Sequence, residues 1–170
     1  MCQLSSLRMQ TKKQKPEPLE RSGLKHAAVD LLSRRDYSRR ELWRKLSPKA
    51  TSSDDLEHVL DELAENNWQS DERFASMFLR SRAGRGLGPL RLRQELREKG
   101  ISDGLIEWAF EESEEDWYDM AVEVARKKAQ SLGSYSPEVK AKLWRFLSYR
   151  GFNSDQIQHA LDDVSSGVSC

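Results

Sequence analysis

The sequence is poor in the residue types that cross-link chains, hold metals or catalyse reactions. It has only two cysteines and three histidines in 170 residues, and Cys2 and Cys170 stand far apart without a CxxC pair. This pattern predicts neither a disulfide framework nor a zinc site, and it is typical of a reducing compartment. His26, His58 and His159 are isolated in helical patterns, so we expect them to be structural or solvent-facing.

Long apolar runs are missing as well. No stretch is long and apolar enough for a membrane span, and the opening residues lack the pattern of a secretory signal. We therefore expect a cytoplasmic protein with no membrane association. Charged residues make up 33% of the chain and apolar residues 37%, with a formal net charge of zero. Such a composition favours an elongated helical protein with a thin core over a compact sphere.

Strand-like alternation is also absent, and the periodicity that is present is helical. Apolar residues recur at spacings of three and four, as in Leu56, Val59, Leu60 and Leu63, which is the pattern of amphipathic helices. Residues 1–21 are basic and contain two prolines, so we expect a disordered basic tail there. A second disordered tail is expected at residues 165–170.

A repeat of about fifty residues organises the chain. Leucines four residues apart recur in three places: Leu42 and Leu46, Leu92 and Leu96, and Leu143 and Leu147. A serine followed by an acid comes after each pair, and we expect Ser53, Ser102 and Ser154 to be helix N-caps. Each copy has room for a preceding helix, at about 23–34, 71–83 and 114–131.

These markers predict an all-α fold of three tandem three-helix repeats stacked into an elongated, curved rod. The predicted repeats span residues 22–69, 70–113 and 114–164. Charge follows the same organisation, because the middle helix of each repeat is basic while acids gather in the third helices of the first two repeats. The neutral total therefore conceals alternating charged bands, which can attract an anion to one face of the molecule.

The strongest basic band, residues 81–100, opens with the glycine-rich segment GRGLGP. A phosphate-binding loop is excluded by context, because no strand precedes this segment and no GK[ST] follows it. We interpret it as a flexible hinge that ends at Pro89, in the first turn of the next helix. On that helix Arg91 with Glu95, and Glu95 with Lys99, have the i,i+4 spacing of ion pairs.

Arg93 and Arg97 differ from their neighbours, because no acid stands at helical spacing from either. The outer repeats have Trp43 and Trp144 where the central repeat has Arg93. Because the central repeat differs here from the other two, we expect Arg93 to be exposed and to have a binding role. A cluster of this kind can hold phosphates or carboxylates. The candidate binding residues are Arg82, Arg85, Arg91, Arg93, Arg97, Arg39, Arg40, Arg44, Lys142, Arg145 and Arg150.

Nothing in the sequence indicates catalysis. Acids form a run at Glu111, Glu112, Glu114, Glu115 and Asp116, but general acid–base work needs two fixed groups in a cleft. No serine or cysteine has a recognisable nucleophile context. We therefore expect a protein that is not an enzyme and needs neither a cofactor nor a metal.

Three segments resemble a known family, the RecX regulators of the bacterial recombinase RecA. They are DLLSRRDYSRRELWRKL, FLRSRAGRGLGPLRLRQELREKGI and KLWRFLSYRGF, and the resemblance covers about residues 23–164. It implies three tandem three-helix repeats that bind RecA filaments on DNA and inhibit strand exchange, ATP hydrolysis and coprotease activity. It also implies binding to single- or double-stranded DNA.

Two other functions stay open on the residues alone. One is a helical-repeat DNA-binding protein that acts without RecA. The other is an enzyme whose site forms between repeats, for which the sequence names no residues. The residues themselves indicate a helical repeat with basic bands, whereas RecA as a partner is implied only by the resemblance.

Overall fold

The computed structural model describes residues 17–167, which form helices and a single isolated bridge. Repeat 1 contains α1 (Arg21–Leu32), α2 (Arg39–Leu46), the 3-10 turn η1 (Ser47–Lys49) and α3 (Ser53–Glu65). Repeat 2 contains α4 (Asp71–Ala83), α5 (Pro89–Glu98) and α6 (Asp103–Glu112). Repeat 3 contains α7 (Trp117–Leu132), α8 (Pro137–Arg150) and α9 (Ser154–Gly167). The prediction of an all-α fold with three tandem three-helix repeats is confirmed.

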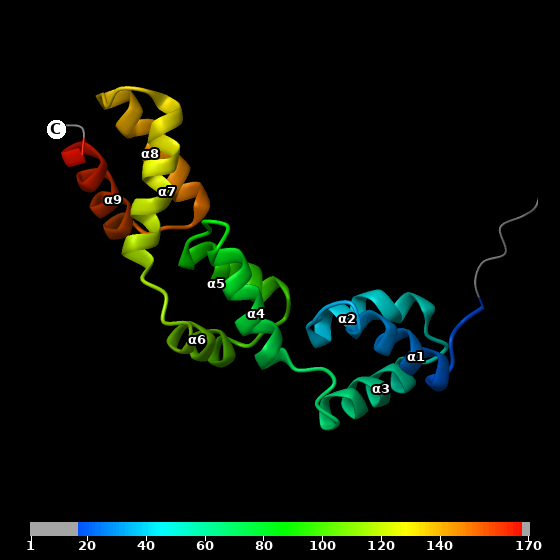
Figure 1. Ribbon diagram of the computed structural model, residues 1–170. Coiled ribbons are helices and arrows are strands. Elements are labelled where there is room, and N and C mark those ends of the chain that lie inside the picture. The colour runs from blue at the N-terminus through cyan, green and yellow to red at the C-terminus, as the bar shows by residue number, and fades with distance from the viewer. Residues whose placement is uncertain (1–16, 168–170) are drawn as a thin grey trace, which may run out of the picture.

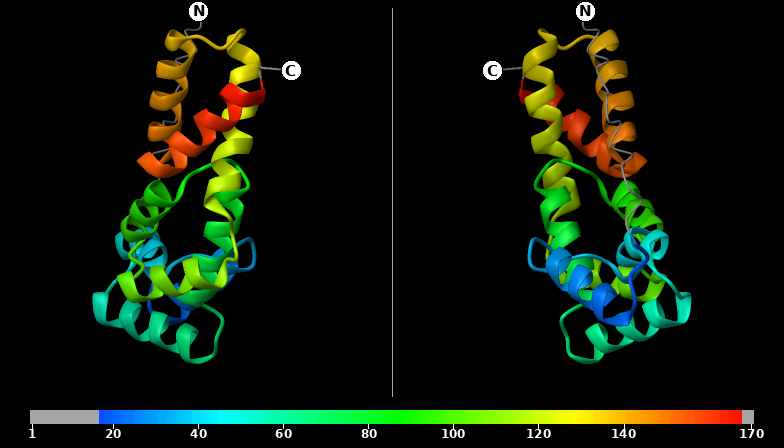
Figure 2. Two further views of the ribbon diagram at one scale, coloured as in Figure 1. Left: turned by 90° about the vertical axis from the view of Figure 1, so that its left-hand side faces the viewer. Right: turned by 90° about the vertical axis from the view of Figure 1, so that its right-hand side faces the viewer.

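The repeats follow one another along an elongated molecule. Figure 1 shows repeat 1 at one end, repeat 2 in the middle and repeat 3 at the other end, with a bend along the way. When the molecule is turned by 90°, repeat 3 forms one end and repeats 1 and 2 overlap at the other (Figure 2). This elongated, curved arrangement leaves much of every repeat open to solvent, as the high charge content requires.

Each repeat has a small hydrophobic core of its own. The recurring leucines of the middle helices are its centre, and none is more than 1% exposed: Leu42, Leu46, Leu92, Leu96, Leu143 and Leu147. A spacing of four puts both leucines of a pair on one helix face, and burying each side chain stabilises the fold by about 1.5–3 kcal/mol. The repeat predicted from these pairs is therefore the unit of the core.

The third helices keep the same register, but their caps lie one residue earlier than predicted in two copies. Ser52 caps α3 by accepting a hydrogen bond from the Asp54 N–H. Before α9, Asn153 and Gln156 exchange two hydrogen bonds between side chain and backbone. Only Ser102 is the predicted cap. The caps at Ser52, Ser102 and Asn153 now have the spacing of the core leucines.

The fold includes parts of both segments that were predicted to be disordered tails. Leu19 forms a parallel bridge with Ala50, and its N–H donates to the carbonyl of Lys49 at 2.6 Å. This segment therefore packs on repeat 1 before residue 22. At the other end α9 runs to Gly167, past the predicted boundary at residue 164. The remaining parts of the predicted tails, residues 1–16 and 168–170, lie outside the described residues.

The seam between repeats 2 and 3 includes direct contacts between backbone groups. The N–H of Gly88 donates to the carbonyl of Arg150 at 2.8 Å, and the N–H of Leu90 donates to the carbonyl of Gly151 at 3.0 Å. A Cβ atom on Gly88 would lie 2.4 Å from the Gly151 carbonyl carbon, closer than packed atoms approach. GRGLGP is therefore not the flexible hinge that we predicted, because it is fixed against the end of α8. Pro89 does begin α5, as predicted.

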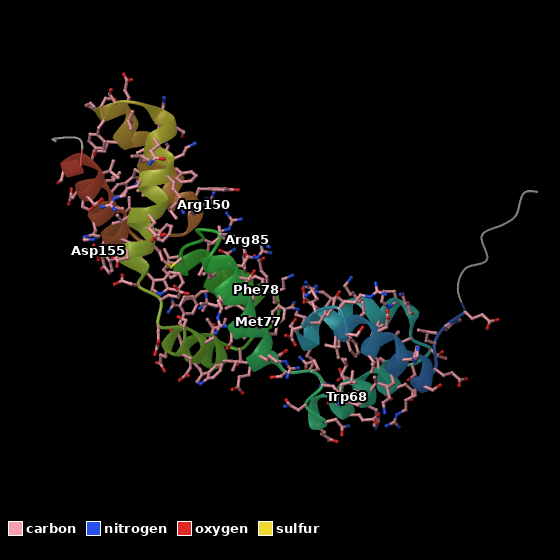
Figure 3. All side chains as sticks on the ribbon, viewed as in Figure 1. Trp68, Met77, Phe78, Arg85, Arg150 and Asp155 are labelled. Atoms are coloured by element: carbon pink, nitrogen blue, oxygen red, sulfur yellow. The ribbon has the colours of Figure 1, made fainter. Side chains whose placement is uncertain are left out.

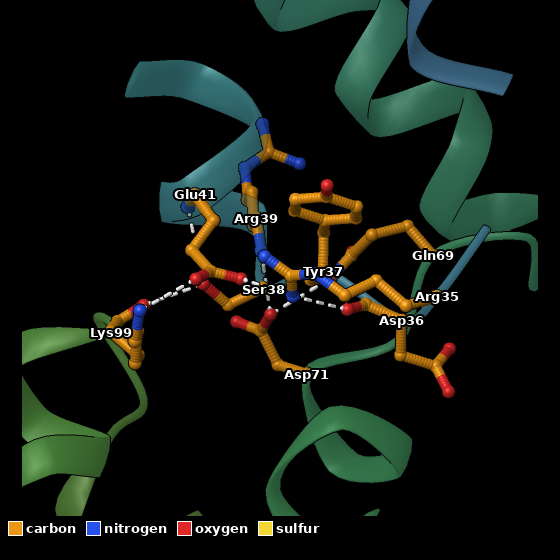
Figure 4. Close-up of polar contacts among 9 residues, drawn as sticks. All are labelled: Arg35, Asp36, Tyr37, Ser38, Arg39, Glu41, Gln69, Asp71 and Lys99. Atoms are coloured by element: carbon orange, nitrogen blue, oxygen red, sulfur yellow. Dashed lines mark hydrogen bonds and ion pairs between the residues drawn. The ribbon is translucent and has the colours of Figure 1, made fainter. Parts of the chain in front are cut away.

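The seam between repeats 1 and 2 is made of side chains (Figure 4). The buried Ser38 hydroxyl donates to the carbonyl of Lys99 at 2.7 Å. The Lys99 ammonium donates to Glu41 at 2.7 Å, so the predicted pair between Lys99 and Glu95 does not form. Arg35 also contacts Glu41, at 3.1 Å. The two contacts of Lys99 join the end of α5 to the start of α2.

Candidate anion-binding face

Arg93 lies in a different environment from the one the sequence suggested. Its guanidinium donates two hydrogen bonds to Glu107 of α6, at 3.0 and 2.9 Å, and lies 4.0 Å from the centre of the Phe110 ring. The side chain is only 28% exposed. Arg93 is therefore half-buried and its charge is paired within the repeat, whereas the sequence suggested an exposed, unpaired charge. These hydrogen bonds hold the pKa of Glu107 below its usual value, against a smaller effect of burial.

Three other candidate arginines also pair within the molecule. Arg97 donates to Asp103 at 2.6 Å, and Arg39 donates to Glu57 and Asp61 at 2.6 and 2.7 Å. Arg91 pairs with Glu95 at 2.9 Å, as predicted. The acids that pair with Arg39, Arg93 and Arg97 belong to the following helix, where i,i+4 spacing cannot reveal them. A phosphate would have to displace these carboxylates, so the four arginines are weak candidates for anion binding.

The other candidates have no ion pair among residues 17–167. They lie in several places. Arg40 and Arg44 belong to α2, and Lys142 and Arg145 are exposed on α8. Arg85 and Arg150 come together across the seam between repeats 2 and 3, where the Arg150 guanidinium donates to the carbonyl of Arg85 at 2.8 Å. Arg82 lies near them, on the last turn of α4.

A cavity of about 770 Å³ opens at this seam, and we call it the basic seam pocket. The end of α4, the loop after it, α7 and α8 form its walls. Five cations and two acids line it: Arg80, Arg85, Lys127, Lys128 and Arg150, with Glu115 and Glu123. None of the five cations makes an ion pair with another described residue. The pocket therefore has an excess of positive charge that the described fold leaves unpaired.

Sequence reasoning missed three of these cations, Arg80, Lys127 and Lys128. The adjacent lysines are a visible signal, but they lie in the first helix of repeat 3, whereas the repeat pattern directs attention to the middle helices. Apolar side chains form part of the pocket wall, and Lys128 and Arg150 lie 5.3 and 5.0 Å from the centre of the Phe146 ring. Figure 3 shows Arg85 and Arg150 on neighbouring elements of the same side of the molecule.

This arrangement suits the binding of an extended anion. Guanidinium groups form paired hydrogen bonds with phosphate or carboxylate oxygens, and lysines add mobile positive charge. Within residues 17–167, no three His, Cys, Asp or Glu side chains are placed to hold a metal ion. No helix in that range is long and apolar enough to cross a membrane.

Fold and site together define a helical-repeat protein, with three small helical units and a pocket of unpaired cations where two of them meet. The chain belongs to the RecX family. Family models for the first, second and third three-helix domains of RecX match residues 25–63, 70–109 and 114–161.

Curated relatives support this assignment along most of the chain. A "Regulatory protein RecX" from Actinobacillus pleuropneumoniae serotype 5b is 44% identical over 78% of this chain and 86% of its own. The one from Haemophilus ducreyi is 42% identical over 81% and 93%. The crystal structure of RecX from Lactobacillus salivarius shares the fold with a TM-score of 0.74 at 23% identity, over 86% of this chain and 97% of that one.

Proposed function

We propose that this protein binds RecA filaments on DNA and inhibits their recombinase, ATPase and coprotease activities, so that it regulates DNA repair and recombination in the cytoplasm. Membership of the RecX family is the observation that carries the proposal. The protein acts by binding, without a cofactor, and its elongated shape lets several repeats contact a polymer at once. Each contact then raises the effective concentration of the next.

The basic seam pocket supplies the DNA-facing part of this proposal. Its cations are available for phosphates, and neutralising phosphates releases condensed counterions, which makes such binding strong at low salt and weaker at high salt. Single- or double-stranded DNA alone is the weaker ligand in this scheme, because it engages only the basic side chains. The filament engages protein surfaces as well.

The direct test is an assay of RecA with this protein at stoichiometric concentration. We expect slower DNA-dependent ATP hydrolysis and slower RecA-stimulated cleavage of its repressor substrate. Unchanged rates of both would contradict the proposal. A parallel screen of the protein alone for nuclease and nucleotide hydrolysis tests the proposal that it is not an enzyme.

A second candidate function is DNA binding without RecA, and the basic seam pocket is the observation that favours it. The two functions differ in their preferred ligand. We expect tighter binding to a RecA filament on single-stranded DNA than to the same DNA without RecA. A preference for bare DNA would replace the first proposal with the second.

A further inference from the structure

A second cavity, of about 420 Å³, lies beside α4 between repeats 1 and 2, and we call it the α4 groove. Its apolar part comes from one helix and consists of Phe74, Met77 and Phe78. Met77 is 53% exposed, which is unusual for a large apolar side chain in this protein. Figure 3 shows Met77 and Phe78 on the same side of the molecule as Arg85 and Arg150. Exposed apolar surface of this kind marks interaction sites.

The charges around the α4 groove do not cancel. Its two acids already have cationic partners: Asp36 accepts from Arg73 at 2.9 Å, and Glu41 accepts from Arg35 and Lys99. Arg82 and Arg85 line the same groove and have no ion pair with any described residue. The Arg82 guanidinium lies 5.2 Å from the centre of the Phe78 ring, directly beside the apolar part.

We propose that the α4 groove binds a protein segment in which an apolar side chain is flanked by carboxylates. The apolar side chain packs on Met77, and the carboxylates pair with Arg82 and Arg85. Methionine adapts its shape to a partner, and methionine, aromatic residues and arginine are enriched where proteins meet. This inference rests on the proposed function, because it identifies where a recombinase filament contacts this chain through protein.

Nucleic acid fits the α4 groove less well than a peptide does. A protein that binds single-stranded nucleic acid commonly offers free aromatic faces on which successive bases stack. The Phe78 ring already contacts Phe74, with 5.6 Å between ring centres, and Arg82. Met77, the most exposed apolar side chain of the groove, has no aromatic face. Arg85 lines both cavities, so the peptide-binding and DNA-binding surfaces lie next to each other on the same side of the protein.

The first experiment compares Met77→Gln with Leu90→Gln, because Leu90 is exposed to a similar extent, 55%, but lies at the other seam. Helical content by circular dichroism confirms folding of both variants. Affinity is measured for a recombinase filament on single-stranded DNA and for the same DNA alone. We expect Met77→Gln to weaken filament binding about thirtyfold, the lower limit for an interface hot spot, and to change binding to bare DNA less than about twofold. Leu90→Gln should leave both affinities unchanged.

A photo-crosslinking side chain at position 77 then identifies what covers the groove. The inference requires a crosslink to the filament protein, at a peptide with Asp or Glu next to the crosslinked residue. A crosslink to labelled DNA, or equal losses of affinity in the Met77 and Leu90 variants, would overturn it. Failure of the unaltered protein to bind filaments would overturn the proposed function, whereas normal filament binding by Met77→Gln would overturn only the inference.

Discussion

The two seams of the molecule use the same position of the repeat in different ways. At each seam, the residue that precedes the glycine after a middle helix offers its carbonyl to the preceding repeat. The carbonyl of Lys99 accepts from the Ser38 side chain, whereas the carbonyl of Arg150 accepts from the Gly88 backbone. The same position of the repeat can therefore connect two repeats either through a side chain or through the backbone alone.

This contrast determines how tightly each pair of repeats is held. Partly exposed ion pairs such as those of Glu41 contribute up to about 1 kcal/mol each and weaken with salt. Backbone contact at Gly151 leaves no room for even one added carbon. A Cβ on Gly100 would also clash at the other seam, but with side-chain atoms of Arg40 and not with backbone. We therefore expect the seam between repeats 2 and 3 to hold the walls of the basic seam pocket more rigidly than the seam between repeats 1 and 2 holds those of the α4 groove.

The strongest effect should come from adding one methyl group to the backbone seam. In Gly151→Ala the new Cβ would lie 2.3 Å from Arg91 Cβ, at a φ of 95° that side chains rarely adopt. We expect the free energy of unfolding in urea to fall by about 2–4 kcal/mol. Gly104→Ala is the matched control, because a Cβ there meets nothing within 4 Å. It should stabilise α6 by about 0.5–1 kcal/mol. Equal effects of the two variants would contradict a rigid seam.

The next largest effect is on DNA affinity, which should depend on the cations of the basic seam pocket and not on the arginines that form ion pairs. Lys127→Ala with Lys128→Ala removes two cations of the basic seam pocket that do not line the α4 groove, so we expect about tenfold weaker binding to single-stranded DNA, or about 1.4 kcal/mol. The slope of log affinity against log salt should fall by about 0.7 for each phosphate that is no longer neutralised. Arg39→Ala with Arg97→Ala is the control, and its affinity should stay within about twofold. Titrations at several salt concentrations measure both quantities.

A smaller effect is expected at the side-chain seam. Glu41→Gln removes the negative charge that pairs with both Arg35 and Lys99, so we expect stability to fall by about 1 kcal/mol and the angle between repeats 1 and 2 to vary more. Distances between spin labels at His58 and Glu111, both exposed, report that angle in a variant without native cysteines. Glu95→Gln, which breaks an ion pair within α5, should leave the distance distribution unchanged. A broadening of similar size in both variants would refute the role of Glu41.

The smallest effect is a dependence on pH. Partial burial acts to raise the pKa of Glu41, but hydrogen bonds from Lys99 and Arg35 outweigh it and leave the pKa below its usual value. A carboxyl with a lowered pKa stabilises the folded state above its unfolded pKa, and this stability is lost as pH falls through the folded pKa. We therefore expect the spin-label distances across this seam to broaden on acidification. Glu41→Gln should remove that dependence, and persistence of it would assign the effect to another group.

Much of the fold can be predicted from the sequence, because it depends on local periodicity. The paired leucines indicate the number of repeats and their register, and Pro89 indicates the start of α5. The predicted caps differ by one residue from Ser52 and Asn153, because these two residues stand next to other good capping residues. The role of Gly88 and Gly151 cannot be predicted, since it depends on a contact between residues far apart in the chain.

The candidate site is only partly predictable for the same reason. Arg85 and Arg150 are separate candidates in the sequence, and the fold brings them together. Arg93 stands out in the sequence because the other two repeats have tryptophan at this position. In the structure its side chain packs within the repeat, and its charge is paired with Glu107 on the next helix. Lys127 escapes sequence reasoning because one wall of the pocket that it lines comes from another repeat.

We expect the unpaired cations held at the backbone seam, and not the paired arginines, to carry the regulatory contact with DNA in the filament. The most direct test is inhibition of RecA's DNA-dependent ATP hydrolysis by the two double variants described above. Lys127→Ala with Lys128→Ala should raise the half-inhibitory concentration about tenfold, whereas Arg39→Ala with Arg97→Ala should leave it within about twofold. The reverse order, or equal increases in the two variants, would contradict this assignment.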